Sequence, residues 1–393
     1  MTRKNKTKKI SFFSNGKMDY SILIITLLLL SMGLIMLLSA SAPTSFAENN
    51  NSYSYVLKQG GVALLGLFAL FAFSSVDYRI FRKLKWLIYF LCLGLLILVG
   101  LFGVGENGAR RWINIGFSFQ PSEFAKVGLI LFFAAYLTDM KENKKIKKFF
   151  PGFFVPVFLF GLIAAVLFFL QNHLSAAIII GMMIAIQMFV AGSAILSDVR
   201  WLMPIIFIVI FGIGCVINMA LAPVEENTNF RFTRIRTWLK LEEADLTGSA
   251  WQITQSLYAI GSGGLFGLGL GNSKQKYLYL PEPQNDFIFA VLAEELGFIG
   301  AIFVIILFAL FVWRGIITAM KAEDNFGTLI AIGITTMIGL QALINIAVVT
   351  NTIPVTGMPL PFFSYGGSAM LADLIAVGIL LSISKNTKKA NNK

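Results

Sequence analysis

The chain has 393 residues, of which 57% are hydrophobic and 13% charged, with a mean hydropathy of +0.77 and a formal net charge of +12. This content is too apolar for a soluble domain, so we expect a multi-pass membrane protein. In such a protein the basic residues are assigned first to the two sides of the bilayer, which excludes nucleic-acid binding as the reason for the net charge. Both cysteines lie in apolar runs and there is one histidine, so neither a disulfide framework nor a metal site built from cysteine or histidine ligands is predicted.

Apolar runs of about 20 residues predict ten membrane-spanning helices. The runs cover residues 20–41, 56–75, 86–105, 121–138, 151–170, 174–192, 201–222, 286–313, 326–350 and 361–384. We therefore expect an all-α polytopic membrane protein with one ten-helix domain at 20–384, between basic tails at 1–19 and 385–393. The first run is too long for a signal peptide, so it is expected to be retained.

The basic residues indicate the orientation of these helices. The side that holds both tails carries 22 of the 32 Lys and Arg residues, so we assign it to the cytoplasm. A long extracellular loop at 223–285 then connects the seventh and eighth helices. Within it, an amphipathic stretch at 251–258 precedes a glycine-rich stretch at 261–271. With no strand before it and no Lys-Ser/Thr after it, this stretch favours a re-entrant or interfacial segment over a nucleotide-binding loop.

Several basic residues lie in predicted outward loops, against the positive-inside pattern. Four of them accompany aromatic residues typical of a membrane interface: Arg111, Arg231, Arg234 and Lys276. Because guanidinium groups pair bidentately with phosphate, we expect this set to bind a lipid-linked phosphate or pyrophosphate. Other basic residues of the long loop, such as Arg236, fit solvated charges or pairs with nearby glutamates.

Three carboxylates occur in the eighth predicted span, which follows the Pro-interrupted residues 277–285. Asp286 is expected at the outer rim, where it fits an N-cap and a functional acid equally well. Glu294 and Glu295 lie deeper, where an ionised group costs at least ~2.5 kcal/mol and needs a partner or a wet cavity. Glu295 lies roughly 180° from Asp286 around the helix, so we expect it to pair with another helix.

Two other spans carry polar residues near their outer ends. Glu123 and Lys126 share one face of the fourth span, which fits an ion pair within that helix. Lys126 lies roughly 7 Å below the helix start, about the depth of Asp286, so a pair between those two residues is the alternative. Ser364 fits either helix packing or the cavity that Asp286 faces. Asp373, deeper in the last span, has no partner that the sequence identifies.

Five stretches together resemble the SEDS family of membrane proteins, which comprises FtsW, RodA and SpoVE. They read GARRWINIG, FSFQPSEFAK, RFTRIRTWL, QSLYAIGSGGLFGLGLGNSKQKYLYLPEPQNDFIFAVLAEELG and PVTGMPLPFFSYGGSA. The resemblance covers residues 19–384 and is nearer to the FtsW and SpoVE branch than to RodA. It implies a ten-span peptidoglycan glycosyltransferase that polymerises lipid II at the outer face of the cytoplasmic membrane, in cell division or sporulation. It also implies a class B penicillin-binding protein and other divisome membrane proteins as partners.

The resemblance assigns roles to two residues and leaves two positions in question. Asp286, in the PQNDFIF motif, is implied to be the catalytic residue, linked to Lys126. The segment 171–175 stands where the family often has QPDLGT, so no role transfers to it. Asp373 stands where asparagine is usual.

The chemistry of joining lipid II units fits these residues. Asp286 is the expected general base, and Lys126 would keep it ionised. The candidate substrate-binding residues are Arg111, Glu123, Arg231, Arg234, Gln255, Lys276, Glu295 and Ser364. No cofactor is required by the sequence, although a divalent cation, Mg²⁺ or Mn²⁺, between Asp286 and the pyrophosphate is compatible with it.

Two other classes of function fit parts of the sequence. A lipid II flippase would also use carboxylates within the membrane, but we find no clear internal repeat, and the charges gather on one outward face. A non-catalytic divisome scaffold would use the packing surfaces but would not require the outward basic residues.

Overall fold

The computed structural model describes residues 16–105, 110–114, 118–193, 238–239, 248–277 and 279–387. Its helices are α1 (Tyr20–Asn49), α2 (Ser54–Ser75), α3 (Ile80–Lys83), α4 (Lys85–Phe102), α5 (Pro121–Glu142), α6 (Val155–Ala165), α7 (Leu174–Ala191), α10 (Gly248–Gly263), α11 (Ile288–Lys321), α12 (Asn325–Val349) and α13 (Gly367–Lys385). π-Helical turns η1 (Phe150–Phe154) and η2 (Val166–Leu170) flank α6. Strands β1 (Ile113–Asn114) and β2 (Ser118–Phe119) form an antiparallel hairpin before α5.

Eight helical stretches of the described chain are long and apolar enough to cross a membrane. They are α1, α2, α4, the continuous stretch Phe150–Leu170, α7, α11, α12 and α13. Helix α5 has 22 residues and is largely buried within the bundle. A mostly helical, multi-pass membrane architecture is therefore confirmed, with the β1–β2 hairpin as a short exception among the described residues. The predicted span at 201–222 lies outside the described residues, so the count of ten helices stays a prediction.

Several predicted boundaries differ from the structure, and three of them concern the end of α1 and the starts of α11 and α13. Helix α1 continues through Pro43 to Asn49, where a loop was predicted, and it ends at Asn50 in the left-handed conformation that closes helices. Helix α13 starts at Gly367 rather than at residue 361, because the preceding turn places Phe362 at φ 67°, which a helix does not accept. Helix α11 starts at Ile288, two residues after Asp286.

Local capping explains several helix starts. The Asp19 side chain accepts a hydrogen bond from Ser21 N at 3.0 Å at the start of α1, and Asp324 accepts one from Gly327 N at 2.7 Å at the start of α12. Pro121 occupies the first turn of α5, where its missing N–H costs nothing. These short signals fix the starts of α1, α5 and α12.

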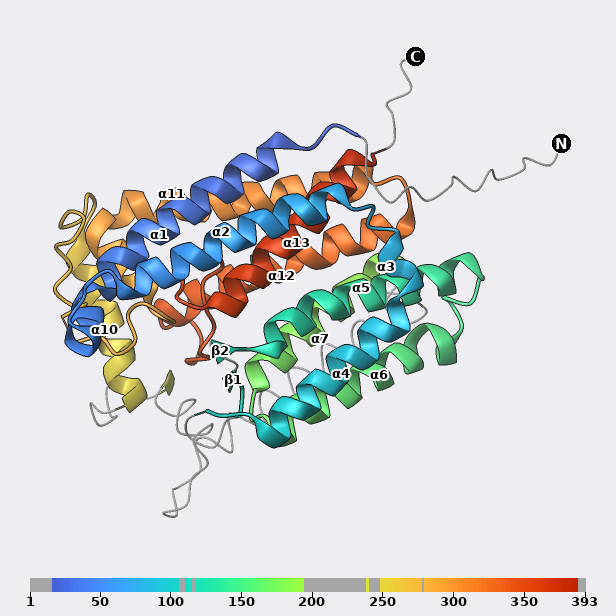
Figure 1. Ribbon diagram of the computed structural model, residues 1–393, viewed down its shortest axis with the longest axis horizontal. Coiled ribbons are helices and arrows are strands. Elements are labelled where there is room, and N and C mark those ends of the chain that lie inside the picture. Colours follow the sequence, from blue (N-terminus) through green and yellow to red (C-terminus); the bar gives the residue numbers. More distant parts are fainter. Residues whose placement is uncertain are drawn as a thin grey trace.

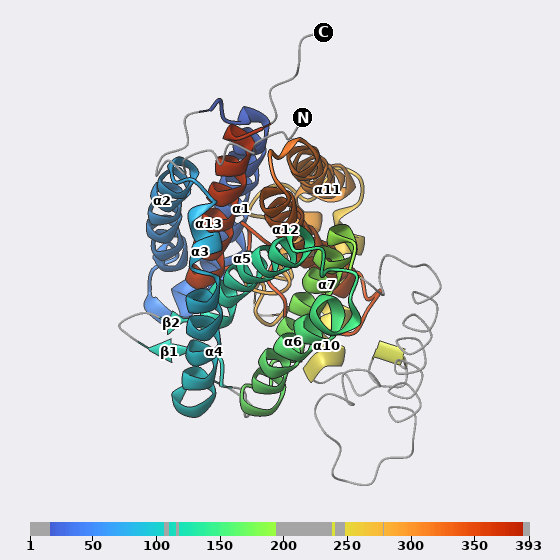
Figure 2. The same ribbon diagram turned by 90° about the vertical axis from the view of Figure 1, so that its right-hand side faces the viewer.

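Helix α13 is the central element of the bundle. It packs against α2, α5, α12, α11 and α1, and α12 in turn contacts α5 and α7. Figure 1 shows α1, α2, α11, α12 and α13 as one set of extended helices and α4 to α7 as a second, and Figure 2 shows α5 and α12 where the two sets meet. Residues on α5, α12 and α13 can therefore share one buried interior.

The start of α1 and the end of α13 lie side by side. Asp19 N donates to Ser384 Oγ at 3.1 Å, and Arg314 of α11 pairs with the Asp19 carboxylate at 2.5 Å. We call this region the Asp19 end and the opposite region the Asp286 end; Figure 1 shows α3 at the former and α10 at the latter.

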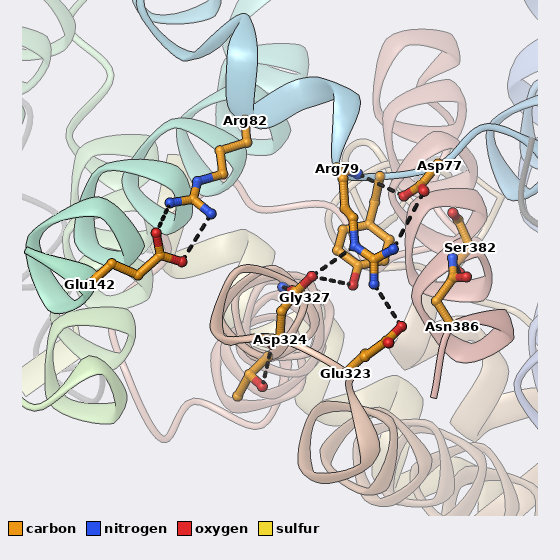
Figure 3. A network of polar contacts seen from close by, with 11 residues as sticks. Asp77, Arg79, Arg82, Glu142, Glu323, Asp324, Gly327, Ser382 and Asn386 are labelled. Carbon is orange, nitrogen blue, oxygen red and sulfur yellow. Dashed lines mark hydrogen bonds and ion pairs between the residues drawn. The ribbon is translucent and has the colours of Figure 1, made fainter. Parts of the chain in front are cut away.

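A network of ion pairs ties the loops together at the Asp19 end (Figure 3). Arg79 contacts Asp324 at 2.9 Å and Glu323 at 2.8 Å, which joins the turn before α3 to the turn between α11 and α12. Arg82 contacts Asp139 at 2.6 Å, which joins α3 to the end of α5. Since both sets of helices are anchored here, this end of the bundle is held as one unit.

Candidate active site

Asp286 lies in the turn before α11 and is half-buried. The N-cap of α11 is Phe287, whose backbone carbonyl accepts from Ala290 N at 2.9 Å, so Asp286 is not the N-cap. A Cβ added to Gly357 would lie 3.4 Å from Asp286 Oδ2. The carboxylate therefore lies against the segment that connects α12 to α13.

Hydrogen bonds from two directions hold this turn. Asn345 Nδ2, on α12, donates to the Asp286 carbonyl at 2.8 Å. From the segment before α13, Ser364 Oγ donates to the Asn285 carbonyl at 2.6 Å, and Tyr365 N donates to the Gln284 carbonyl at 2.8 Å. Three consecutive carbonyls are thus fixed by groups distant in sequence, which restricts how far Asp286 can move. Ser364 lies with the Asp286 turn; its contact with substrate stays a prediction.

Glu123 and Lys126 form the ion pair within α5 that their spacing predicts. Lys126 Nζ lies 2.7 Å from Glu123 Oε2, and both side chains are at most 5% exposed. The pair between Lys126 and Asp286 stays a prediction. If that pair forms, the Lys126 ammonium interacts with the carboxylates of both Glu123 and Asp286.

His173 lies close to this ion pair, just before α7. Its side chain is buried, and it interacts electrostatically with Arg111 and Lys126. Burial, reinforced by those two positive charges, lowers the pKa of His173 well below its usual value. Arg111 itself donates from Nη2 to the Asn172 carbonyl at 3.2 Å. The divergent segment 171–175 therefore places a histidine that favours its uncharged form within range of the charges of Arg111 and Lys126.

The deeper acids hold the loop that leads to Asp286. Glu295 pairs with Lys276 at 2.9 Å, with the two side chains 0% and 4% exposed, and it accepts from Ser39 Oγ of α1 at 2.6 Å. This is the contact with another helix that its position on α11 predicts. Glu294 accepts from Ser273 Oγ at 2.5 Å and from Lys274 N at 2.8 Å. The loop is therefore fastened to α11 by both carboxylates.

Lys276 is buried, and protein groups occupy its ammonium. Its ammonium donates to Glu295, to Ser39 Oγ at 2.9 Å and to the Gly271 carbonyl at 2.7 Å. A role in pyrophosphate binding stays a prediction, and it would require this arrangement to open. A mostly apolar cavity of about 590 Å³ lies beside Lys276; Asp286 is not among its lining residues. It is lined by the second half of α1 and by Ser52, Tyr53, Leu270, Gly271, Lys276 and Tyr277.

The glycine-rich stretch lies along α11. Gly297 interrupts that helix at φ 68°, and Leu268 N and Gly269 N donate to the carbonyls of Glu294 and Glu295, each at 3.0 Å. A Cβ on Gly267 would stand 2.2 Å from the Glu295 carbonyl oxygen. The glycines are therefore needed for close approach of the loop to α11.

Residues 20–389 match the family described as Cell cycle protein, FtsW/RodA/SpoVE. The chain belongs to this family.

Two named relatives align with nearly the whole chain. The chain is 43% identical to "Stage V sporulation protein E" of Bacillus subtilis (strain 168) over 373 residues, covering 94% of this chain and 98% of that protein. It is 39% identical over 382 residues to "Probable peptidoglycan glycosyltransferase FtsW" of Trichlorobacter lovleyi, covering 96% of each. The resemblance to the FtsW/RodA/SpoVE family is thereby confirmed.

Two solved structures share the fold. One, described as "Structural coordination of polymerization and crosslinking by a peptidoglycan synthase complex", superposes with a TM-score of 0.74 at 25% identity, covering 93% of this chain and 97% of that one. The RodA of Thermus thermophilus gives a TM-score of 0.66 at 25% identity, covering 95% and 98%. The helical arrangement is therefore that of the family.

The remaining predicted residues are placed as follows. Gln255 is buried in α10, which packs along α11. Arg231 and Arg234 lie outside the described residues. In the part of the chain that is described, no group of three or more His, Cys, Asp or Glu side chains could hold a metal ion. Sequence reasoning missed Asn345, although an amide within an apolar span was a signal that could have found it.

Proposed function

We propose that this protein is a peptidoglycan glycosyltransferase that polymerises lipid II into glycan strands. The observation that carries the proposal is the clamped turn of Asp286, which holds one carboxylate at the end of a membrane bundle. Membership of the family and the names of the relatives support the same activity. The Lys and Arg residues gathered at the Asp19 end, among them Arg79 and Arg82, support a cytoplasmic assignment of that end, so the reaction is assigned to the outer face of the membrane.

The proposed step is one glycosyl transfer. The acceptor sugar hydroxyl attacks the anomeric carbon of the donor, a C–O glycosidic bond forms, and the C–O bond to the lipid pyrophosphate breaks. Asp286 takes the hydroxyl proton as general base, and the pyrophosphate leaves with the bonding electron pair. The clamp on residues 284–286 would limit the motion of the base toward the hydroxyl.

Basic side chains would stabilise the negative charge of the leaving group. Arg111 is the described candidate for the lipid pyrophosphate, together with Arg231 and Arg234 from the loop. Lys126 would keep Asp286 ionised in the resting state. Proton abstraction then requires that contact to loosen, because a close cation also reduces the basicity of a carboxylate. A divalent cation between Asp286 and the pyrophosphate stays an untested alternative.

A partner follows from the same proposal. The solved complex with the same fold couples polymerisation to crosslinking, by its own description. We therefore expect this protein to work with a class B penicillin-binding protein transpeptidase among the divisome or sporulation membrane proteins.

The class of function is tested with purified protein and lipid II, with and without the transpeptidase partner. Glycan chains in a gel assay are expected. Reconstituted vesicles that carry lipid II in one leaflet give the second measurement, because a flippase would move the lipid between leaflets without making chains. Flipping without polymerisation would replace the proposal with a lipid II flippase. If the protein shows neither activity, the result would favour a non-catalytic scaffold.

A further inference from the structure

Asp373 is a buried acid that the proposed reaction does not use. It lies in α13, is 3% exposed, and interacts electrostatically with Lys126 and Glu123 of α5. Its Oδ1 has no hydrogen-bond partner within the described part of the chain. An unpartnered carboxylate oxygen at this depth requires a physical explanation.

The helix register places Asp373 at the level of the ion pair. Gln120 N, at the start of α5, donates to Ser368 Oγ at 2.9 Å, which joins the starts of α5 and α13. Both helices run from there toward the Asp19 end. At a rise of 1.5 Å per residue, Asp373 lies about 7.5 Å beyond Ser368, and Lys126 about 9 Å beyond Gln120. One ammonium and two carboxylates therefore occupy the same layer of the bundle.

The described helices that pack against α5 and α13 bring no second cation to this layer. Helix α12 contains no charged residue, and Lys58 of α2 is exposed near the start of that helix. On α11, Glu295 pairs with Lys276, and Arg314 pairs with Asp19. Burial lowers the pKa of His173, which interacts with Lys126, so its imidazole favours the uncharged form. Asp373 thus faces Glu123 and Lys126 as its charged neighbours among the described residues.

One buried ammonium compensates one buried carboxylate, and a second ionised carboxylate beside it is costly. We propose that Glu123 and Asp373 share one exchangeable proton, and that Asp373 is a positioning residue for Lys126. While the proton is present, a single ionised acid holds Lys126. When the proton leaves, two acids hold Lys126 and draw it from Asp286. This positioning role rests on the proposed glycosyl transfer, whereas the shared proton does not.

Infrared spectroscopy of the purified wild-type protein tests the shared proton directly. A buried protonated carboxylic acid gives a carbonyl band that shifts in D₂O, and we expect this band in the wild type. Either Asp373→Asn or Glu123→Gln leaves a single acid, which then pairs with Lys126, so the band is expected to disappear in both variants. Asp77→Asn, a buried acid beside Arg79 at the Asp19 end, is the control that keeps it. A band that survives in Asp373→Asn or in Glu123→Gln would overturn the shared proton.

The pH profile of lipid II polymerisation tests the positioning role. Each profile is scaled to the maximum of its own variant, so a general loss of activity does not affect the comparison. The wild type is expected to gain activity at alkaline pH with an inflection that Asp373→Asn lacks and Asp77→Asn retains, because withdrawal of Lys126 loosens the contact that reduces the basicity of Asp286. The same alkaline inflection in Asp373→Asn would overturn the positioning role. A wild type that makes no glycan would instead contradict the proposed function, and the infrared measurement would still decide the shared proton.

Discussion

Asn345 joins the turn of Asp286 to the segment before α13 through a single side-chain amide. Its Nδ2 donates to the Asp286 carbonyl at 2.8 Å and to the Met358 carbonyl at 2.7 Å. The side chain is buried, so water does not replace these bonds when they are removed. The position of the proposed base therefore depends on a residue that is not expected to touch substrate.

Replacement of Asn345 by Ala should lower the rate of polymerisation more than it lowers substrate affinity. One buried and one partly buried carbonyl lose their donor, at about 1–3 kcal/mol for the buried one. If about 1.4 kcal/mol of this appears in the barrier, kcat falls about tenfold. Single-turnover rates with lipid II would measure the change. Gln341→Leu, one turn earlier on α12, is the control that should keep kcat; equal rates for Asn345→Ala and wild type would contradict a positioning role.

Gly297→Ala should destabilise the protein severely. The residue adopts φ 68°, and an added Cβ would stand 2.3 Å from Gly267 N. In the variant, both the backbone strain and the steric clash would push the glycine-rich loop away from α11. Thermal unfolding in detergent should show a large loss, whereas Gly261→Ala in α10, with open space around its Cβ, should show little change. Similar unfolding temperatures for the two variants would contradict this packing.

The pair Lys276 and Glu295 should behave as a structural unit in a double-mutant cycle. Lys276→Met leaves the buried Glu295 carboxylate without its cation, which typically costs about 3–5 kcal/mol of stability. Glu295→Leu leaves the buried Lys276 ammonium without its carboxylate. The double variant should be more stable than the sum of the single losses predicts. Additive losses would show that the two charges do not interact. Lipid II binding by the double variant then reports whether Lys276 also contacts the pyrophosphate.

His173 should make the stability of the protein fall in mild acid. Burial and the charges of Arg111 and Lys126 lower its folded-state pKa below the ordinary value of 6.5. The unfolded chain therefore binds the proton more readily. The contribution of His173 is complete above about pH 6.5 and is lost as the pH falls from there toward the folded-state pKa. Unfolding temperatures between pH 7 and pH 5 should decline in the wild type and less so in His173→Gln; parallel declines would contradict a neutral buried histidine.

The apolar spans could be predicted from the sequence because the bilayer fixes the length and composition of each helix. The ends of these helices were harder to predict from the sequence. Helix α1 continues beyond its apolar run, and the start of α13 depends on contacts of Ser364 and Tyr365 with the Asp286 turn. Such tertiary contacts have no local periodicity, so they do not show in a hydropathy pattern.

Spacing predicted contacts within one helix better than contacts between helices. The three-residue interval between Glu123 and Lys126 was sufficient to predict their ion pair. The enclosure of Lys276 was not predictable, because it depends on Ser39, more than 200 residues away in the sequence. Likewise, Asp373 gained charged neighbours only when the depths of α5 and α13 were known.

The central claim is that Asp286 is the general base of lipid II polymerisation. The most direct measurement is the rate of glycan-chain formation by purified Asp286→Asn, which keeps the shape of the side chain but cannot accept the proton as a carboxylate does. We predict a loss of ~10²- to 10⁴-fold, the usual contribution of a general base. Asp77→Asn, purified and assayed in parallel, should retain activity. An Asp286→Asn protein that polymerises lipid II as fast as the wild type would contradict the assignment.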